Sequence, residues 1–297
     1  MWTGNVRAKW HDYSGRAIYH LTLMKSADAG DFGTLAGSLE RPFIAASAIG
    51  TAIKQALREL QEIHPSLHLY QYALMPDHLH LLLAVDGPLD DILGRKLAAF
   101  KVRVNKLSSI EQVFANGFND QILKPGRSLD AIYRYLRENP YKLAVRRAHP
   151  EYFRRINRIR IADTEYAAYG NIQLLDNPFK EQVIVHRADS AITHADNEHR
   201  WLHTAANGGV LVSPFISSRE KEIRRKAEEV GGRIILIQNL GFGERGKPGA
   251  HDFDQCAKGE LLILTPTSAN LPEELSRACC LAMNTCAETL AATSPCR

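Results

Sequence analysis

Two histidines separated by one residue, His78 and His80, carry the sharpest chemical signal in the sequence. They lie in the segment MPDHLHLLL, residues 75–83, whose apolar content favours a β-strand. Because side chains alternate along a strand, both histidines share one face and the intervening leucines share the other. Two imidazoles on one face can bind a single divalent ion, which would act as a Lewis acid on a phosphoryl oxygen. The alternative is one histidine at the surface and one packed against a helix.

A tyrosine and an asparagine four residues apart, Tyr135 and Asn139, form the second candidate, in the segment RYLRENP. On a helix this spacing puts both side chains on one face. A phenol with a pKa of about 10 is a weak nucleophile while protonated, so a nearby cation is the complement it needs. Asn139 could supply such a cation with an oxygen ligand. The alternative for Tyr135 is an ordinary half-buried aromatic, and Pro140 predicts a kink or an end of the helix at Asn139.

Alternating strand and helix patterns must position these residues. Strands are predicted at 17–23, 67–74, 78–85 and about 118–123, and helices at 43–63, at 89–107 and from an N-cap at Ser128 to about 148. The order β-α-β-β-α-β is that of a ferredoxin-like sheet. We therefore predict an α+β ferredoxin-like domain over residues 1–160.

Short, continuous apolar runs replace this pattern in the second half of the chain. They occur at 183–185, 209–212, 234–238 and 261–264, with helical stretches between them, notably 217–230. Such runs are typical of strands buried on both faces of a parallel sheet. After an arginine-rich connector at 154–160, we predict a Rossmann-like α/β domain with a parallel sheet over residues 161–297.

Charge differs between these two predicted domains. Residues 1–160 hold 23 Lys and Arg against 15 Asp and Glu, whereas residues 161–297 hold 14 against 18. The excess of Lys and Arg in the first domain suggests that only this domain binds a polyanion. A basic surface exposed to solvent explains the excess equally well. The predicted helix at 89–107 carries a dense basic set that is the candidate DNA-binding surface: Arg95, Lys96, Lys101, Arg103 and Lys106.

The cellular setting follows from what the sequence lacks. It contains no run of about 18 apolar residues that could span a bilayer, and its start lacks the order of a secretory signal. We therefore expect a soluble, cytoplasmic protein with no membrane partner.

The two motifs together resemble those of the single-tyrosine HUH transposases, particularly the REP-associated tyrosine transposase branch. MPDHLHLLL is similar to that family's strand with two metal-binding histidines, and YLRENP is similar to its YIxxNP helix. The resemblance covers about residues 16–148. It implies that Tyr135 is the nucleophile and that His78, His80 and Asn139 bind Mg²⁺ or Mn²⁺.

The same resemblance implies a reaction and its partners. Tyr135 would cleave and rejoin single-stranded DNA through a 5′-phosphotyrosine link, as in DNA transposition, on strands that often form hairpins. A monomer or a homodimer would be expected. Because family members are usually shorter, the added second domain leaves two alternatives open: a module that binds single-stranded nucleic acid, or a domesticated regulator without cleavage activity.

Overall fold

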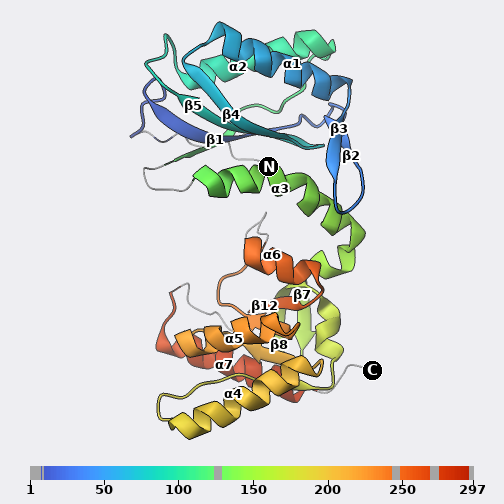
Figure 1. Cartoon of the computed structure of the whole chain (residues 1–297), viewed down its shortest axis with the longest axis vertical. Helices are drawn as coiled ribbons and strands as arrows, with labels where there is room; N and C mark the ends of the chain where they lie inside the picture. Colours follow the sequence, from blue (N-terminus) through green and yellow to red (C-terminus); the bar gives the residue numbers. More distant parts are fainter. Residues whose placement is uncertain (1–7, 9, 124–128, 243–247, 268–273, 294–297) are drawn as a thin grey trace. The chain divides into compact units, whose positions relative to one another are not determined.

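The computed structural model describes residues 8, 10–123, 129–242, 248–267 and 274–293 of the 297-residue chain. Its contacts divide the chain into two compact units, Met1–Val145 and Arg146–Arg297 (Figure 1). Both mix helices with sheets, so the chain is of the α+β type, with an antiparallel four-stranded sheet in the first unit and a mixed six-stranded sheet in the second.

The sheet of the first unit has the strand order β4-β5-β1-β6, with every neighbouring pair antiparallel. Its strands are β1 (Ala17–Met24), β4 (Leu67–Leu74), β5 (His78–Val85) and β6 (Asn119–Ile122). The expected alternation holds on β5, where Leu79, Leu81 and Leu83 belong to the main core and Leu82 belongs to a second cluster on the other face. The sheet therefore buries both of its faces.

Helices cover the two faces of this sheet (Figure 1). On one face α1 (Ala48–Ile63) and α2 (Leu93–Ser108) contribute Ile53, Leu57, Leu97 and other residues to the main core. On the other face α3 (Leu129–Ala148) packs Leu136 against Leu82 and Ala73. The face of β5 that carries His78 and His80 is therefore the face that α3 covers.

The bounds of two helices in the first unit, α1 and α3, agree only in part with those predicted. The helix predicted from residue 43 begins only at Ala48, after the N-cap Ser47, because residues 43–46 form β3 (Phe43–Ala46) of a two-stranded sheet with β2 (Gly33–Ala36). The helix α3 runs to Ala148 as predicted and continues through Pro140, so the alternative of an end at Asn139 is wrong. The N-cap predicted at Ser128 lies outside the described residues.

The sheet of the second unit is mixed, not wholly parallel as predicted. Its strand order is β7-β8-β12-β11-β10-β9, in which β9 to β12 run parallel and β8 and β7 run antiparallel to their neighbours. The strands are β7 (Arg154–Ile161), β8 (Thr164–Gly170), β9 (Lys180–Gln182), β10 (Val210–Ser213), β11 (Arg233–Ile237) and β12 (Leu261–Pro266). The four parallel strands follow one another in chain order, joined by helices.

Two apolar clusters bury the faces of this second sheet. One face packs against α4 (Ala191–Ala206), α5 (Ser218–Glu229) and α6 (Ala250–Ala257), which contribute residues such as Trp201, Ile223 and Cys256. The opposite face packs against α7 (Arg277–Ala292) and the short 3₁₀ helix η2 (Ile172–Asp176). A second 3₁₀ helix, η1 (Pro150–Phe153), precedes β7.

The boundary between the units lies 15 residues before the predicted one, because the arginine-rich segment forms a strand of the second sheet. Residues 1–145 hold 17 Lys and Arg against 14 Asp and Glu, and residues 146–297 hold 20 against 19. The contrast between a basic and an acidic half therefore disappears when the charges are counted by structural unit. Among the described residues, no helix is long and apolar enough to cross a bilayer.

Candidate active site

His78 and His80 lie on the face of β5 that α3 covers, with their Nε2 atoms 3.1 Å apart. His80 is 5% exposed, and His78 is half-buried. The intervening Leu79 points into the main core, as the alternation predicted. The structure therefore brings the two imidazoles of the HxH motif to one point.

The opposite nitrogens of both rings already have partners. His78 Nδ1 lies 2.7 Å from the Asp77 carboxylate, and His80 Nδ1 lies 3.0 Å from the Thr22 hydroxyl. A third histidine, His20, places its Nε2 3.2 Å from His80 Nδ1. Such contacts fix the orientation of a ring and leave Nε2 available for another role.

Sequence reasoning did not identify His20, although it lies in the predicted first strand. On β1, His20 and Thr22 share one face while Tyr19, Leu21 and Leu23 are fully buried in the main core. Two polar side chains on the α3-facing side of an otherwise apolar strand were the available signal. These two residues alone do not indicate a site, because their proximity to His80 depends on the pairing of β1 with β5, which sets Thr22 opposite His80.

Burial governs the protonation of these histidines. It lowers the pKa of His80 to about 3, and the nearby His78 and His20 rings add to this shift. Burial also lowers the pKa of His20, whereas a hydrogen bond with the Gln121 side chain acts in the opposite direction. His80 is therefore neutral at pH 7, which is the form of imidazole that binds a metal ion.

Tyr135 lies over this histidine cluster. Its ring centroid is 5.6 Å from that of His80 and 5.7 Å from that of His20, both in edge-to-face geometry. The side chain is 40% exposed, so a bulky substrate can reach it. Two segments about 55 residues apart in sequence thus meet at one place.

A lysine of the same helix accompanies the tyrosine. Lys142 Nζ lies 5.6 Å from the centre of the Tyr135 ring, and Lys142 also pairs with Glu138 at 3.0 Å. A cation above an aromatic ring stabilises negative charge on the phenol oxygen as well as the ring itself. Lys142 is a further site residue that spacing along the sequence did not single out.

Asn139 lies one helical turn beyond Tyr135. Its Nδ2 donates to the Tyr135 carbonyl oxygen at 2.9 Å. This bond uses the amide nitrogen, so the amide oxygen is the atom that could act as a ligand. The structure places Asn139 on the helix that covers the histidines, and its role as a ligand stays a prediction.

The residues present fit a divalent ion. Metal–nitrogen bonds of about 2.1 Å put neighbouring ligand atoms roughly 3.0–3.4 Å apart, and the two Nε2 atoms are 3.1 Å apart. If each Nδ1 carries the proton, the two Nε2 lone pairs face each other and repel unless a cation lies between them. No group of three or more His, Cys, Asp or Glu side chains within the described ranges could hold a metal ion, so the pair needs a ligand of another type.

Two other tyrosines, Tyr133 and Tyr141, lie close to Tyr135 in sequence. Tyr133 packs against the cluster of Ala73, Leu82 and Leu136 beneath α3. Tyr141 is 41% exposed, like Tyr135. The ring contacts with His20 and His80 belong to Tyr135.

The predicted DNA-binding residues lie on α2, on the opposite side of the sheet from α3. Arg95 pairs with Asp91, Lys96 with Asp90, and Arg103 binds both oxygens of Glu59 on α1. Lys106 is exposed. The structure therefore does not bring these five residues together with Tyr135, and their role in DNA binding stays a prediction.

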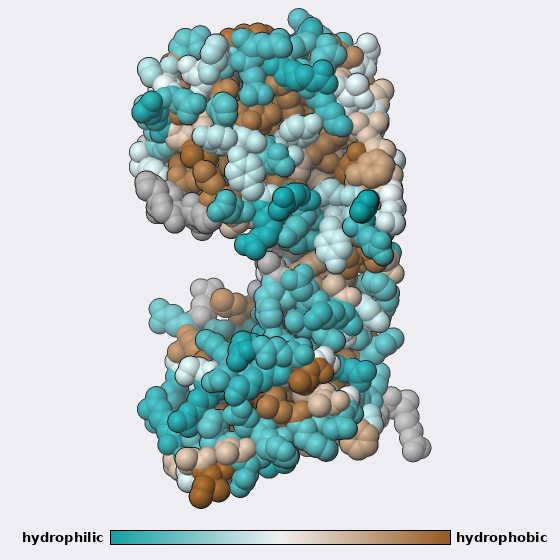
Figure 2. Space-filling view, in the orientation of Figure 1, coloured by the Kyte–Doolittle hydropathy of each residue, from teal (hydrophilic) through white to brown (hydrophobic). Residues whose placement is uncertain are grey.

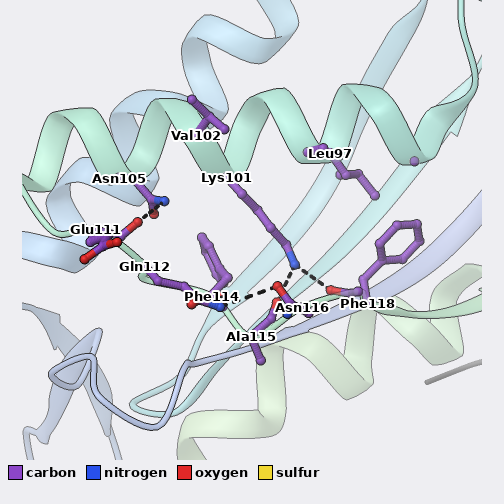
Figure 3. Close-up of a pocket in the computed structure, with 13 residues that line it drawn as sticks. Leu97, Lys101, Val102, Asn105, Glu111, Gln112, Phe114, Ala115, Asn116 and Phe118 are labelled. Atoms are coloured by element: carbon purple, nitrogen blue, oxygen red, sulfur yellow. Dashed lines mark hydrogen bonds between the residues drawn. The ribbon is translucent and has the colours of Figure 1, made fainter. Parts of the chain in front are cut away.

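Lys101, the fifth of this set, joins α2 to the segment that leads into β6. Its Nζ donates to the carbonyl oxygens of Ala115 at 2.7 Å and Gly117 at 2.5 Å (Figure 3). These bonds lie beside a cavity of about 390 Å³ between α2 and residues 111–118. The geometry gives Lys101 a structural task within the unit.

The chain was compared with known proteins. No family model and no curated protein matches it. Among solved structures, a REP-associated tyrosine transposase bound to a REP hairpin is similar at 12% identity and a TM-score of 0.35, over 46% of this chain and 74% of that chain. A protein of Deinococcus radiodurans R1, provisionally assigned as a transposase, is similar at 14% identity and a TM-score of 0.28, over 45% of this chain and 97% of that chain.

Proposed function

We propose that the first unit is a metal-dependent tyrosine nuclease and strand transferase of single-stranded DNA, related to the single-tyrosine HUH transposases. Tyr135 is the nucleophile, and His78, His80 and Asn139 hold Mg²⁺ or Mn²⁺. One observation carries the proposal: Tyr135 lies beside a pair of imidazoles. Its ring centroid is 5.6 Å from that of His80, and the Nε2 atoms of His78 and His80 are 3.1 Å apart.

The reaction is a transfer between oxygens on phosphorus. The deprotonated phenol oxygen of Tyr135 bonds to the phosphorus, the bond to the 3′-oxygen breaks, and that oxygen takes up a proton. The products are a 5′-phosphotyrosine link and a free 3′-OH, and attack by a 3′-OH in the reverse direction rejoins the strand. When bound, the divalent ion supplies Lewis acidity to the attacked phosphate.

The residues of the chain supply positioning and charge. Lys142 brings a positive charge within 5.6 Å of the centre of the Tyr135 ring. The buried, neutral His80 is ready to act as a ligand without first losing a proton. His20 and Thr22 hold the other side of the His80 ring.

The arrangement of the first unit also supports this proposal. The strand order β4-β5-β1-β6, with α2 following β5 and with the β2–β3 pair inserted between β1 and α1, is consistent with a ferredoxin-like sheet. In this pattern the histidine strand lies at the centre of the sheet, and the face left open by α1 and α2 is the one that receives α3. Single-stranded hairpin DNA is the proposed substrate.

Within one chain the ring of Tyr135 contacts those of His20 and His80, which supports a site built from a single copy. The monomer or homodimer expected from the sequence stays a prediction.

The experiment uses hairpin DNA labelled at either end, with Mn²⁺, on a denaturing gel. A 3′-label is expected to appear in a protein-linked band, and a 5′-label in a shorter free strand that ends in 3′-OH. Tyr135→Phe, His78→Ala and EDTA should each abolish both products, whereas the matched Tyr133→Phe control should retain them. Binding without any cleavage across several hairpins and metals would instead favour a nucleic-acid-binding module.

A further inference from the structure

The edge strand of the second sheet carries a row of exposed arginines. The strand β7 contributes four of them within seven residues: Arg154, Arg155, Arg158 and Arg160. Between them, Ile156 and Ile159 pack against the core cluster of the second unit that contains Ile161. A register shift between Ile156 and Ile159 places two consecutive polar residues outward, so the isoleucines face inward and the arginines face solvent.

Three of these arginines keep charge available to a ligand: Arg154, Arg158 and Arg160. Arg158 pairs with Glu165 at 3.1 Å while its side chain remains 79% exposed, and Arg155 donates to the carbonyl oxygen of Phe242. Within the described part of the chain, Arg154 and Arg160 pair with no carboxylate. We call these four residues the β7 arginine surface.

The charge of the second unit is concentrated at this place. Residues 146–160 hold six arginines and one glutamate, whereas residues 161–297 hold 14 Lys and Arg against 18 Asp and Glu. Hydrophilic side chains dominate the face of the second unit seen in Figure 2, so polar exposure alone does not distinguish β7 from the rest of this face. The one-sided accumulation of arginine is distinctive, because mutual repulsion makes it costly unless a polyanion neutralises it.

Protection of a free sheet edge is the plainest alternative explanation. Edge strands commonly carry charged residues that prevent pairing with another chain. One or two charges, or a lysine, serve that purpose. Edge protection does not require four arginines on one strand, nor six arginines against one glutamate across 15 residues.

We propose that the β7 arginine surface binds the phosphate backbone of a nucleic acid. The planar guanidinium donates two parallel hydrogen bonds to phosphate and keeps its charge at every physiological pH. Alternate residues of a strand, such as Arg158 and Arg160, are spaced about 7 Å apart on one face, so they can contact successive groups of an extended polyanion. Contacts of this type position a strand without reading its sequence. This proposal goes beyond the Tyr135 site and does not depend on its chemistry.

The test measures salt-dependent DNA binding by the full chain in a Tyr135→Phe background with EDTA, so that no covalent product contributes. The double variant Arg154→Gln/Arg160→Gln removes two arginines that pair with no described carboxylate. The matched control Arg219→Gln/Arg225→Gln removes two exposed arginines of α5 in the same unit. The probe is a fluorescent single-stranded oligonucleotide followed by anisotropy from 50 to 300 mM salt.

The slope of log affinity against log salt should fall by about 0.7 for each lost phosphate contact, so by about 1.4 in the β7 variant. Affinity at 0.1 M salt should fall about tenfold or more, while the control stays within twofold of the parent. Equal slopes and affinities for the two double variants would overturn the proposal. The proposal would also be overturned if the β7 variant lost affinity only for polyglutamate, a polyanion without phosphate, and not for the oligonucleotide. Neither result depends on whether the protein cleaves DNA.

Discussion

His80 is the residue on which the candidate site depends most, because three polar side chains and one aromatic ring meet around it. Its Nε2 faces His78, its Nδ1 faces Thr22 and His20, and its ring meets the edge of Tyr135. Ligand histidines need such outer partners to fix their tautomer and orientation, and losing one commonly reduces metal affinity 10- to 100-fold. His20 is therefore expected to matter although it touches no substrate.

Substitutions of His20 can separate its hydrogen bond from its ring. His20→Phe keeps a ring against Tyr135 but removes the nitrogen that faces His80, and it should weaken Mn²⁺ binding at least tenfold. His20→Gln keeps a hydrogen-bonding group and should stay within threefold of the parent. The signal of free Mn²⁺ in electron paramagnetic resonance measures both affinities. Parent-like binding by His20→Phe would contradict a positioning role, and the exposed His68→Ala serves as the control.

Individual residues differed in how far the sequence could identify them. His78, His80 and Tyr135 were predicted because alternation on a strand and spacing on a helix are local rules. His20 and Lys142 were missed for a physical reason. Their importance comes from the pairing of β1 with β5 and from the packing of α3, which bring together residues far apart in sequence.

Among the elements, α2 illustrates how a basic pattern can serve the fold. Lys101 holds the carbonyl oxygens of Ala115 and Gly117, so Lys101→Met should lower the free energy of unfolding by about 1.5–3 kcal/mol, the range for hydrogen bonds to charged groups. The exposed Lys106→Met on the same helix should change it by less than about 0.5 kcal/mol. Urea unfolding followed by circular dichroism compares the two. Equal effects would show that Lys101 has no structural task.

The pair of α1 and α2 should also respond to pH. Hydrogen bonds from Arg103, and next from Gln55, lower the pKa of Glu59 on α1 to about 2 from an ordinary 4.5. Because the folded value is the lower one, this stabilisation is present above pH 4.5 and is lost as the pH falls from 4.5 towards 2. The destabilisation caused by Glu59→Gln should therefore be largest near pH 7 and should shrink at pH 3.

Urea midpoints at the two pH values test this expectation. The exposed Glu62→Gln on the same helix controls for the loss of one carboxylate. A difference between parent and Glu59→Gln that does not change with pH would exclude a contribution from this ion pair.

Some elements were predictable and others were not. The helices around Ile53 and Leu97 and the strand of Leu81 follow from their apolar periodicity. The sequence pattern predicts the start of a helix at β3, because FIAA continues the apolar spacing of α1, whereas Ser47 is the N-cap of that helix. The strand β7 was read as a connector, because its register shift breaks the alternation of Ile156, Ile159 and Ile161.

At the scale of the whole chain, the candidate nuclease site lies entirely within Met1–Val145. Each unit has its own apolar core, so unfolding should show two transitions. Trp201→Ala in the second unit removes a side chain that is 2% exposed and should destabilise that unit by about 3–5 kcal/mol. Calorimetry should show one transition shifted and the other retained, with Mn²⁺ binding unchanged. Simultaneous loss of both transitions would contradict independent units.

The division into units was only partly predictable. The change from alternating patterns to short apolar runs lies near the boundary between the two units, yet the charge contrast between the halves was produced by the six arginines of residues 146–160. Which sheet a strand joins depends on pairing across the fold, here of β7 with β8. A one-dimensional pattern does not contain that information.

The most direct test of the account is to locate the DNA-linked residue. Trypsin cleaves after Arg127, Arg134 and Arg137, so Tyr133, Tyr135 and Tyr141 fall on three separate peptides. After reaction with hairpin DNA and Mn²⁺, nuclease trimming and digestion, mass spectrometry should find the nucleotide mass on the peptide YLR, or on a longer peptide fragmented to Tyr135. A nucleotide on Tyr133 or Tyr141, or on no tyrosine in a sample that has cleaved its DNA, would contradict the assignment of Tyr135 as the nucleophile.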